Sequence, residues 1–131
     1  MGDLSFPEIQ RHRRGHAFLP PASILDRIPR PYATEHVPAP DKMIWAHWFA
    51  SNADWWAAEL DRDDWLIFGY AKVGSGDGEW GTSSLTEMEQ VSVSGRIVTN
   101  VRTREMRRVP GLIIVERDCH WEPRKWSEVT R

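Results

Sequence analysis

The sequence predicts an α+β fold: a single domain built on a twisted antiparallel sheet of roughly five or six strands, with one short helix and a proline-rich N-terminal arm packed on the sheet. Three observations lead to this prediction. The chain has 131 residues, which suits one domain with its own core. Several short runs of aromatic and branched residues are separated by turn-forming residues. Six of the nine prolines lie between residues 20 and 40, where they exclude long helices.

The first 40 residues are predicted to be an arm rather than part of the sheet. Residues 1–17 are rich in arginine and histidine, and we expect them to form a flexible basic tail ahead of a domain spanning 18–131. The prolines allow a helical turn or two at 22–28, "ASILDRI", between extended segments. The arm is therefore expected to run in extended form across the domain.

Four strands are expected in the next part of the chain. The runs 43–50, 54–60 and 64–73 are enriched in aromatic and branched residues, and the short connections between them carry turn formers. These features predict an antiparallel meander. A fourth, short strand is expected near 79–83, after the loop "GSGDG", whose glycines suit a tight turn.

A helix and two further strands complete the predicted domain. Ser84 and Glu87 have the spacing of a capping box, which predicts that a short helix begins there. Residues 96–103 alternate branched and polar side chains, and 111–118 contains a compact apolar run, so both are expected to be strands. The segment at about 94–109 then reads as a basic hairpin.

The eight tryptophans are predicted to lie mostly in the core. Strict alternation along 54–60 places Trp56 and Leu60 on one side of the strand, and Trp55 and Glu59 on the other. Both sides therefore carry a large ring, which indicates a sheet covered on both faces. We expect one or two rings to line a groove at the margin, and the candidates for this position are Trp48, Trp80 and Trp121.

Composition limits the classes of partner. The chain has 17 basic and 19 acidic residues, a net charge of −2, so no overall field attracts nucleic acid or an anionic membrane. Cys119 is the only cysteine, which excludes an internal disulfide and suits a reducing compartment. The N-terminal residues lack the apolar region of a signal peptide, and no run approaches the roughly 18 apolar residues of a membrane span. We expect a soluble, cytoplasmic protein with no membrane partner.

Several motifs follow one another in a fixed order along the chain: Pro31-Tyr32-Ala33-Thr34-Glu35, the Trp-Trp strand with Glu59, Gly81 with Ser84 and Leu85, and Glu116-Arg117-Asp118 followed by His120, Pro123, Ser127 and Glu128. By the order of these motifs rather than by any one of them, the sequence from about Phe18 to Val129 resembles the bacterial family called domain of unknown function 2958. The basic N-terminal extension and the long segment 94–109 depart from the family pattern. The resemblance implies a context, since members are typically encoded on plasmids, phages and other mobile elements, and implies no reaction.

One pattern points to metal or acid/base chemistry. Glu116, Asp118 and His120 fall on the same side of an extended segment, and carboxylates with an imidazole form a typical ligand or proton-transfer set. A metal site would need a further ligand from His36, Glu35 or Glu59.

The same residues also fit a structural network that ties both ends of the chain to the sheet. In that interpretation Arg117 pairs with neighbouring carboxylates and with the arm. The residues expected to have structural roles are Tyr32, Thr34, Glu35, Trp56, Glu59, Ser84, Glu87 and Arg117.

Local arginine clusters are the sequence's candidates for binding nucleic acid. A basic patch can follow a phosphate backbone, and a marginal tryptophan can stack on a base. The candidate binding residues of the hairpin are Arg102, Arg104, Arg107 and Arg108.

The sequence thus leads to the expectation of a non-enzymatic accessory or interaction protein of a bacterial mobile element. We expect a protein or nucleic-acid partner, no cofactor, and a monomer or small homo-oligomer. The alternative is a metal-assisted hydrolase or nuclease that uses Glu116, Asp118 and His120.

Overall fold

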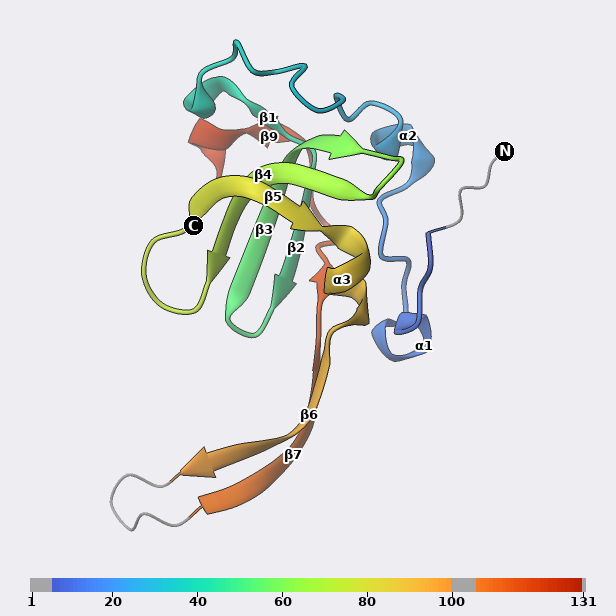
Figure 1. Cartoon of the computed structure of the whole chain (residues 1–131), viewed down its shortest axis with the longest axis vertical. Helices are drawn as coiled ribbons and strands as arrows, with labels where there is room; N and C mark the ends of the chain where they lie inside the picture. Colours follow the sequence, from blue (N-terminus) through green and yellow to red (C-terminus); the bar gives the residue numbers. More distant parts are fainter. Residues whose placement is uncertain (1–5, 100–105, 131) are drawn as a thin grey trace.

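A five-stranded antiparallel sheet, with strand order β5-β4-β3-β2-β8, forms the centre of the molecule (Figure 1). The computed structural model describes residues 6–99 and 106–130. Most of the sheet is a meander of consecutive strands, as the sequence predicts, and the arrangement confirms the α+β class. The strands of this sheet are β2 (Ala46–Ala50), β3 (Ala53–Asp61), β4 (Leu66–Val73), β5 (Glu79–Ser84) and β8 (Glu116–Arg117).

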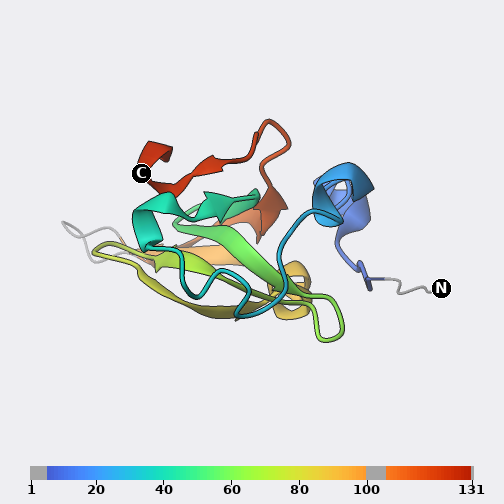
Figure 2. The same cartoon turned by 90° about the horizontal axis from the view of Figure 1, so that it is seen from above.

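Two smaller sheets and several short helices accompany the central sheet (Figures 1 and 2). One small sheet pairs β1 (Met43–Ile44) with β9 (Arg124–Lys125), and the other pairs β6 (Ser92–Thr99) with β7 (Met106–Ile114). Figure 1 shows the β6–β7 hairpin projecting away from the central sheet. The helices are α1 (Arg11–Arg14), α2 (Ala22–Leu25), α3 (Leu85–Gln90) and the 3₁₀ turns η1 (Ala39–Asp41) and η2 (Trp126–Glu128). Within the described residues, none of the helices has the length and apolar character required to cross a bilayer.

The N-terminal segment lies against the domain, which corrects the expectation of a separate basic tail for its described residues. The side chain of Arg14 has no solvent exposure, and its guanidinium contacts the carboxylate of Glu89 in α3 at 2.7 Å. Glu8 completes the buried group with a 3.0 Å contact to the same guanidinium. Burial raises the pKa of Glu89, but hydrogen bonds from Arg14 and from the N–H groups of Ile9 and Gln10 outweigh it and hold that pKa below its ordinary value.

A β-bulge in β3 corrects the predicted alternation of its side chains. The pairing with β4 shifts register between Ala57 and Glu59, because a bulge opposes two residues of one strand to one residue of the other. After the shift, Glu59 lies opposite Phe68, and Leu60 lies opposite Ile67. Strict alternation places Leu60 on the same side of the strand as Trp56. The bulge instead turns the Leu60 side chain to the opposite face of the sheet.

The core consists of two clusters, one on each face of the sheet, as expected for a sheet covered on both sides. No tryptophan is among the exposed residues, so the prediction that the rings mainly fill the interior is confirmed. Trp48 was expected at the margin, and this is wrong: it is 1% exposed, and its indole N–H donates to the carbonyl oxygen of Phe18 at 2.9 Å. The larger cluster contains Phe18, Leu25, Ala46, Trp48, Ala57, Leu60, Trp65, Ile67, Leu85, Met88 and Val115, and the smaller one Ile44, Trp56, Ala58, Trp126 and Val129.

Candidate functional site

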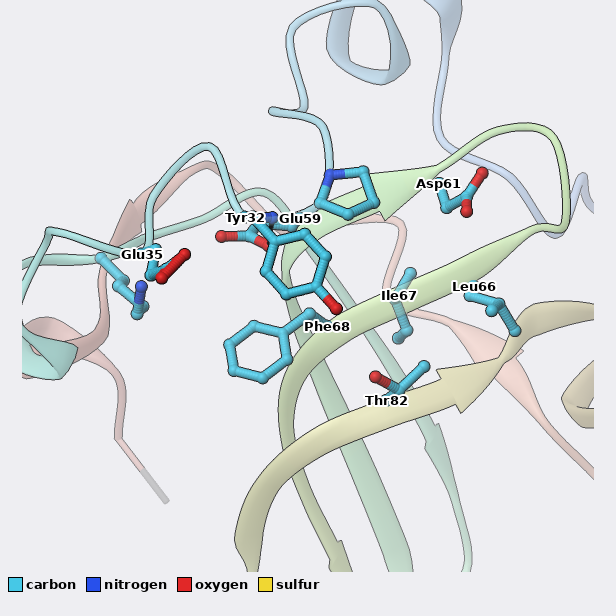
Figure 3. A pocket seen from close by; sticks show the side chains of 10 residues that line it. Tyr32, Glu35, Glu59, Asp61, Leu66, Ile67, Phe68 and Thr82 are labelled. Atoms are coloured by element: carbon cyan, nitrogen blue, oxygen red, sulfur yellow. Dashed lines mark hydrogen bonds between the residues drawn. The ribbon is translucent and has the colours of Figure 1, made fainter.

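A groove of about 480 Å³ lies between the arm and the strands β3, β4 and β5 (Figure 3). Its size falls within the range of about 300–1,000 Å³ that is usual for ligand sites. The arm side supplies Pro31, Tyr32, Glu35 and Lys42, and the strand side supplies Glu59, Asp61, Leu66, Ile67, Phe68 and Thr82.

The β3 bulge builds the floor of this groove. Glu59 pairs with Phe68 across β3 and β4, and Phe68 pairs with Thr82 across β4 and β5. Because paired residues of antiparallel strands share a face, these three side chains form a row across the sheet. Without the bulge, Ala58 would lie opposite Phe68. The Glu59 carboxylate would then point to the other face of the sheet, into the larger core cluster.

Glu59 also holds the arm in place. The residue is only 4% exposed. Its carboxylate accepts hydrogen bonds from the N–H of Tyr32 (2.7 Å), the N–H of Thr34 (3.1 Å) and the hydroxyl of Thr34. The Lys42 ammonium donates to the carbonyl oxygen and the hydroxyl of Thr34, at 2.5 and 3.1 Å. These contacts fix residues 31–35, which we call the arm hook, over the edge of the groove.

The hook presents an exposed aromatic ring. Tyr32 has φ +69°, in the left-handed region that non-glycine residues seldom adopt, and the residue remains 79% exposed. In the view of Figure 3 its ring lies beside that of Phe68. Phe68 in turn contacts Trp80, with 6.0 Å between the ring centroids. One wall of the groove is therefore aromatic, and it continues toward β5.

The groove carries more acidic than basic groups: Glu35, Glu59 and Asp61 line it together with one base, Lys42. Glu35 and Asp61 lie at opposite ends of the groove in Figure 3. The Lys42 ammonium donates its hydrogen bonds to Thr34. Arg62 pairs with Asp26 at 2.8 Å rather than with a groove carboxylate. Within the described residues, no salt bridge to either carboxylate is present. Among the residues that the structure describes, the donors to the Asp61 carboxylate are the backbone N–H groups of Asp63, at 2.9 Å, and Asp64, at 3.4 Å.

A comparison with known protein families identifies the family of this chain. A family model described as "Protein of unknown function (DUF2958)" matches residues 32–127, which is more than half of the sequence. The chain belongs to the DUF2958 family. Searches of curated proteins and of solved structures found no match. The matched region begins at Tyr32 of the hook and includes every groove residue except Pro31.

This DUF2958 chain does not bring Glu116, Asp118 and His120 together at one point. The Glu116 carboxylate lies 3.5 Å from the ring of His16, whereas Asp118 contacts the ring of His47 at 3.0 Å. His120 is exposed, and its backbone N–H donates to Asp118 at 3.0 Å. His36 lies exposed on the arm. Among the residues that the structure describes, no group of three or more histidine, cysteine or acidic side chains is arranged to hold a metal ion.

Sequence reasoning missed the residue at the centre of this region, His47 of β2. Its Nδ1 faces Asp118 at 3.0 Å and its Nε2 faces Asp54 at 2.8 Å, and the ring stacks on Trp56 with 5.1 Å between centroids. Burial raises the pKa of Asp118, but hydrogen bonds from His47 and from the N–H of His120 lower it by more than burial raises it. The pKa of Asp118 therefore lies below its ordinary value. The two carboxylates lie on opposite sides of the ring, and the imidazole thus braces β2 to β3 and to residue 118. A histidine alone in an aromatic run gives no sequence signal for this role.

Some of the residues predicted to be structural connect separate segments of this chain. The Ser84 hydroxyl accepts the N–H of Glu87 at 3.2 Å, which confirms the predicted helix start. Arg117 is predicted to pair with neighbouring carboxylates, but within the part of the chain that the structure describes it forms no salt bridge. Its side chain instead donates to the carbonyl oxygen of Ala17 at 3.2 Å and so ties β8 to the N-terminal segment. Glu35 was expected to join this network, but it lies at the groove rim instead.

The predicted binding residues lie in three different places. Arg102 and Arg104 lie outside the described residues. Arg107 and Arg108 belong to β7, in register with Val98 and Ile97 of β6. Two of the tryptophans expected at the margin are partly buried: Trp80 packs on Phe68 and Tyr70, and the indole N–H of Trp121 donates to the carbonyl oxygen of Ile44 at 3.1 Å.

Proposed function

We propose that this DUF2958 protein is a non-enzymatic interaction protein that binds a segment of a partner protein by taking one lysine or arginine side chain into the groove. The observation that carries the proposal is an aromatic groove whose two rim carboxylates, Glu35 and Asp61, have no cationic partner among the described residues. The role of an accessory protein of a bacterial mobile element is supported by the context that the family resemblance implies.

The chemistry of the groove matches a long cationic side chain. The methylene stem of a lysine or arginine packs against apolar surface while its charged end reaches polar groups. Tyr32 is an exposed residue, and its ring offers both apolar surface and a π face for a cation. A phosphate group would meet the negative charge of Glu35 and Asp61 at the rim. The groove therefore favours a protein segment over a nucleic acid.

A minimal probe tests the groove directly. We expect Nα-acetyl-lysine methylamide to shift the amide NMR signals of Tyr32, Thr34 and Phe68. The uncharged Nα-acetyl-norleucine methylamide has the same four-carbon stem without the ammonium group, and it should bind about two- to fivefold more weakly, because it lacks the charge worth roughly 0.5–1 kcal/mol at an exposed site. The measurement is a titration of ¹⁵N-labelled protein at low salt.

Matched variants assign the effect to the rim carboxylates. Glu35→Gln and Asp61→Asn are expected to remove most of the preference for the charged probe. Asp26→Asn, which removes a carboxylate that pairs with Arg62 away from the groove, should leave it unchanged. Equal binding of the two probes, or shifts scattered outside the groove, would refute the proposal.

A second candidate partner is nucleic acid at the β6–β7 hairpin. The specific observation is that this hairpin forms its own two-stranded sheet and projects from the domain (Figure 1), while its sequence contains the arginine cluster of residues 96–108. A projecting basic hairpin has the form of an element that follows a phosphate backbone.

Fluorescence anisotropy with labelled DNA distinguishes this candidate. If the hairpin binds DNA, the logarithm of the affinity should fall linearly with the logarithm of salt concentration. The pair Arg107→Glu and Arg108→Glu should abolish binding, whereas Lys125→Glu in β9 should not. Absence of binding at low salt would remove this partner class and leave the groove proposal untouched.

The geometry does not favour the alternative of a metal-assisted hydrolase or nuclease. Asp118 is engaged by His47, and Glu116 lies beside His16. Stoichiometric metal in the purified protein, lost in His120→Ala without unfolding, would restore that alternative.

A further inference from the structure

Strand β5 is a free edge of the central sheet, and it borders the groove. In the strand order β5-β4-β3-β2-β8 it has β4 on one side only, and no other described strand pairs with its outer side. In Figure 2 the yellow strand β5 lies along one margin of the sheet. Thr82, in the middle of the strand, is exposed and lines the groove. An unpaired strand edge is a template onto which another extended chain can add.

The register identifies the backbone groups that face outward. The N–H of Leu85 donates to the carbonyl oxygen of Trp65 at 2.9 Å, and the β4–β5 pairing continues from there without a shift. Hydrogen-bonded pairs alternate along an antiparallel ladder, so every second residue back from Leu85, Gly81 among them, bonds to β4. Thr82 and Trp80 fall between these residues. Their N–H and C=O groups point toward the free side.

The same register connects this edge to the groove. Thr82 lies opposite Phe68, so its side chain is on the groove face, at the end of the row that starts at Glu59. A residue that pairs with Thr82 from the outer side also directs its side chain to the groove face. A long cationic side chain at that position enters the groove from its β5 side.

We propose that the partner segment binds in extended conformation, as a further antiparallel strand on β5, with a lysine or arginine opposite Thr82. This inference rests on the proposed function, because the same groove receives the side chain. The occupant is a segment of another protein rather than a second copy of β5. The sequence of β5, "EWGTSS", carries an acidic residue and no cation, and so offers nothing to the groove carboxylates.

Peptide probes test the strand pairing without changing the protein. The blocked peptide acetyl-Thr-Val-Lys-Val-Thr-amide should bind about tenfold more tightly than Nα-acetyl-lysine methylamide, because it adds backbone hydrogen bonds to β5. Methylation of the lysine backbone nitrogen, whose N–H faces β5, should remove this gain. Methylation of the nitrogen of the following valine, whose N–H faces away, is the matched control and should leave most of the gain.

A second measurement locates the contact on the protein. In the bound state, the amide hydrogens of Thr82 and Trp80 should become protected from exchange, whereas those of Gly81, already bonded to β4, should change little. If the peptide binds no tighter than the single lysine, or if both methylations act equally, strand addition is refuted while the groove proposal stands. If neither probe binds, both are refuted. A protein dimer that must dissociate before the peptide binds would assign the edge to a second copy and overturn the inference.

Discussion

At the scale of single residues, buried carboxylates organise the parts of the chain that have no regular structure. Glu59 holds the arm hook through the N–H groups of Tyr32 and Thr34, and Glu89 holds the N-terminal segment through Arg14 and two further N–H groups. In both cases the acid is almost fully buried, and the charge is offset by donors from a distant segment. Hydrogen bonds to a charged acceptor are the stronger kind, so each carboxylate orders a segment that would otherwise be loose.

Glu59→Gln tests this role at the groove. The amide keeps one oxygen acceptor but places an NH₂ group against one of the arm's N–H donors, and we expect a loss of about 2 kcal/mol in the free energy of unfolding. Urea denaturation measures this loss, and faster exchange of the Tyr32 amide should accompany it. The control is Glu35→Gln, a groove acid outside any salt bridge in the described structure, which should change the free energy by less than about 0.5 kcal/mol. Equal effects of the two changes would contradict the role given to Glu59.

At the scale of elements, the bulge in β3 decides what each face of the sheet carries. It sends Leu60 into the larger core cluster and brings Glu59 into line with Phe68 and Thr82. The partner strand is adapted to it: a Cβ built on Gly69 would lie 1.7 Å from the carbonyl oxygen of Trp56. The groove therefore depends on backbone geometry at the bulge as much as on the side chains that line it.

Gly69→Ala should destabilise the protein by about 3 kcal/mol, because the atom it would collide with belongs to the backbone and cannot rotate away. Thermal or chemical denaturation measures the change. The matched control is Gly81→Ala, at the directly paired position of β5, where an added Cβ meets nothing within 4 Å. A small effect at both positions would contradict the close approach of the two strands.

At the scale of the whole molecule, the two ends of the chain close the domain. The N-terminal segment packs on α3 and on Val115 through Arg14, whose Nε donates to the carbonyl oxygen of Val115 at 3.2 Å. The C-terminal strand β9 pairs with β1. Residues 6–17 are thus part of the folded unit, although they lie outside the family match of 32–127.

Arg14→Ala should cost about 3–5 kcal/mol of unfolding free energy, because it leaves the Glu89 carboxylate buried without its partner. Arg13→Ala is the control, since Arg13 is an exposed residue whose side chain donates to Gln10, three residues before it, and it should cost less than about 0.5 kcal/mol. Chemical denaturation gives both values. If the two variants are equally stable, the N-terminal segment is not part of the folded unit.

The sequence by itself determined the fold class, the meander, the helix start at Ser84 and the burial of the tryptophans, because each depends on local signals: residue type, alternation and turn formers. It also carried the family resemblance in the order of its motifs. Only the tertiary structure decided the groove, because Glu59 reaches Phe68 and Thr82 through a bulge that alternation does not predict. The same holds for His47, whose two carboxylate partners lie on other segments, and for the free edge of β5, which is defined by strand order. Long-range pairing brings these groups together, and no short stretch of sequence encodes it.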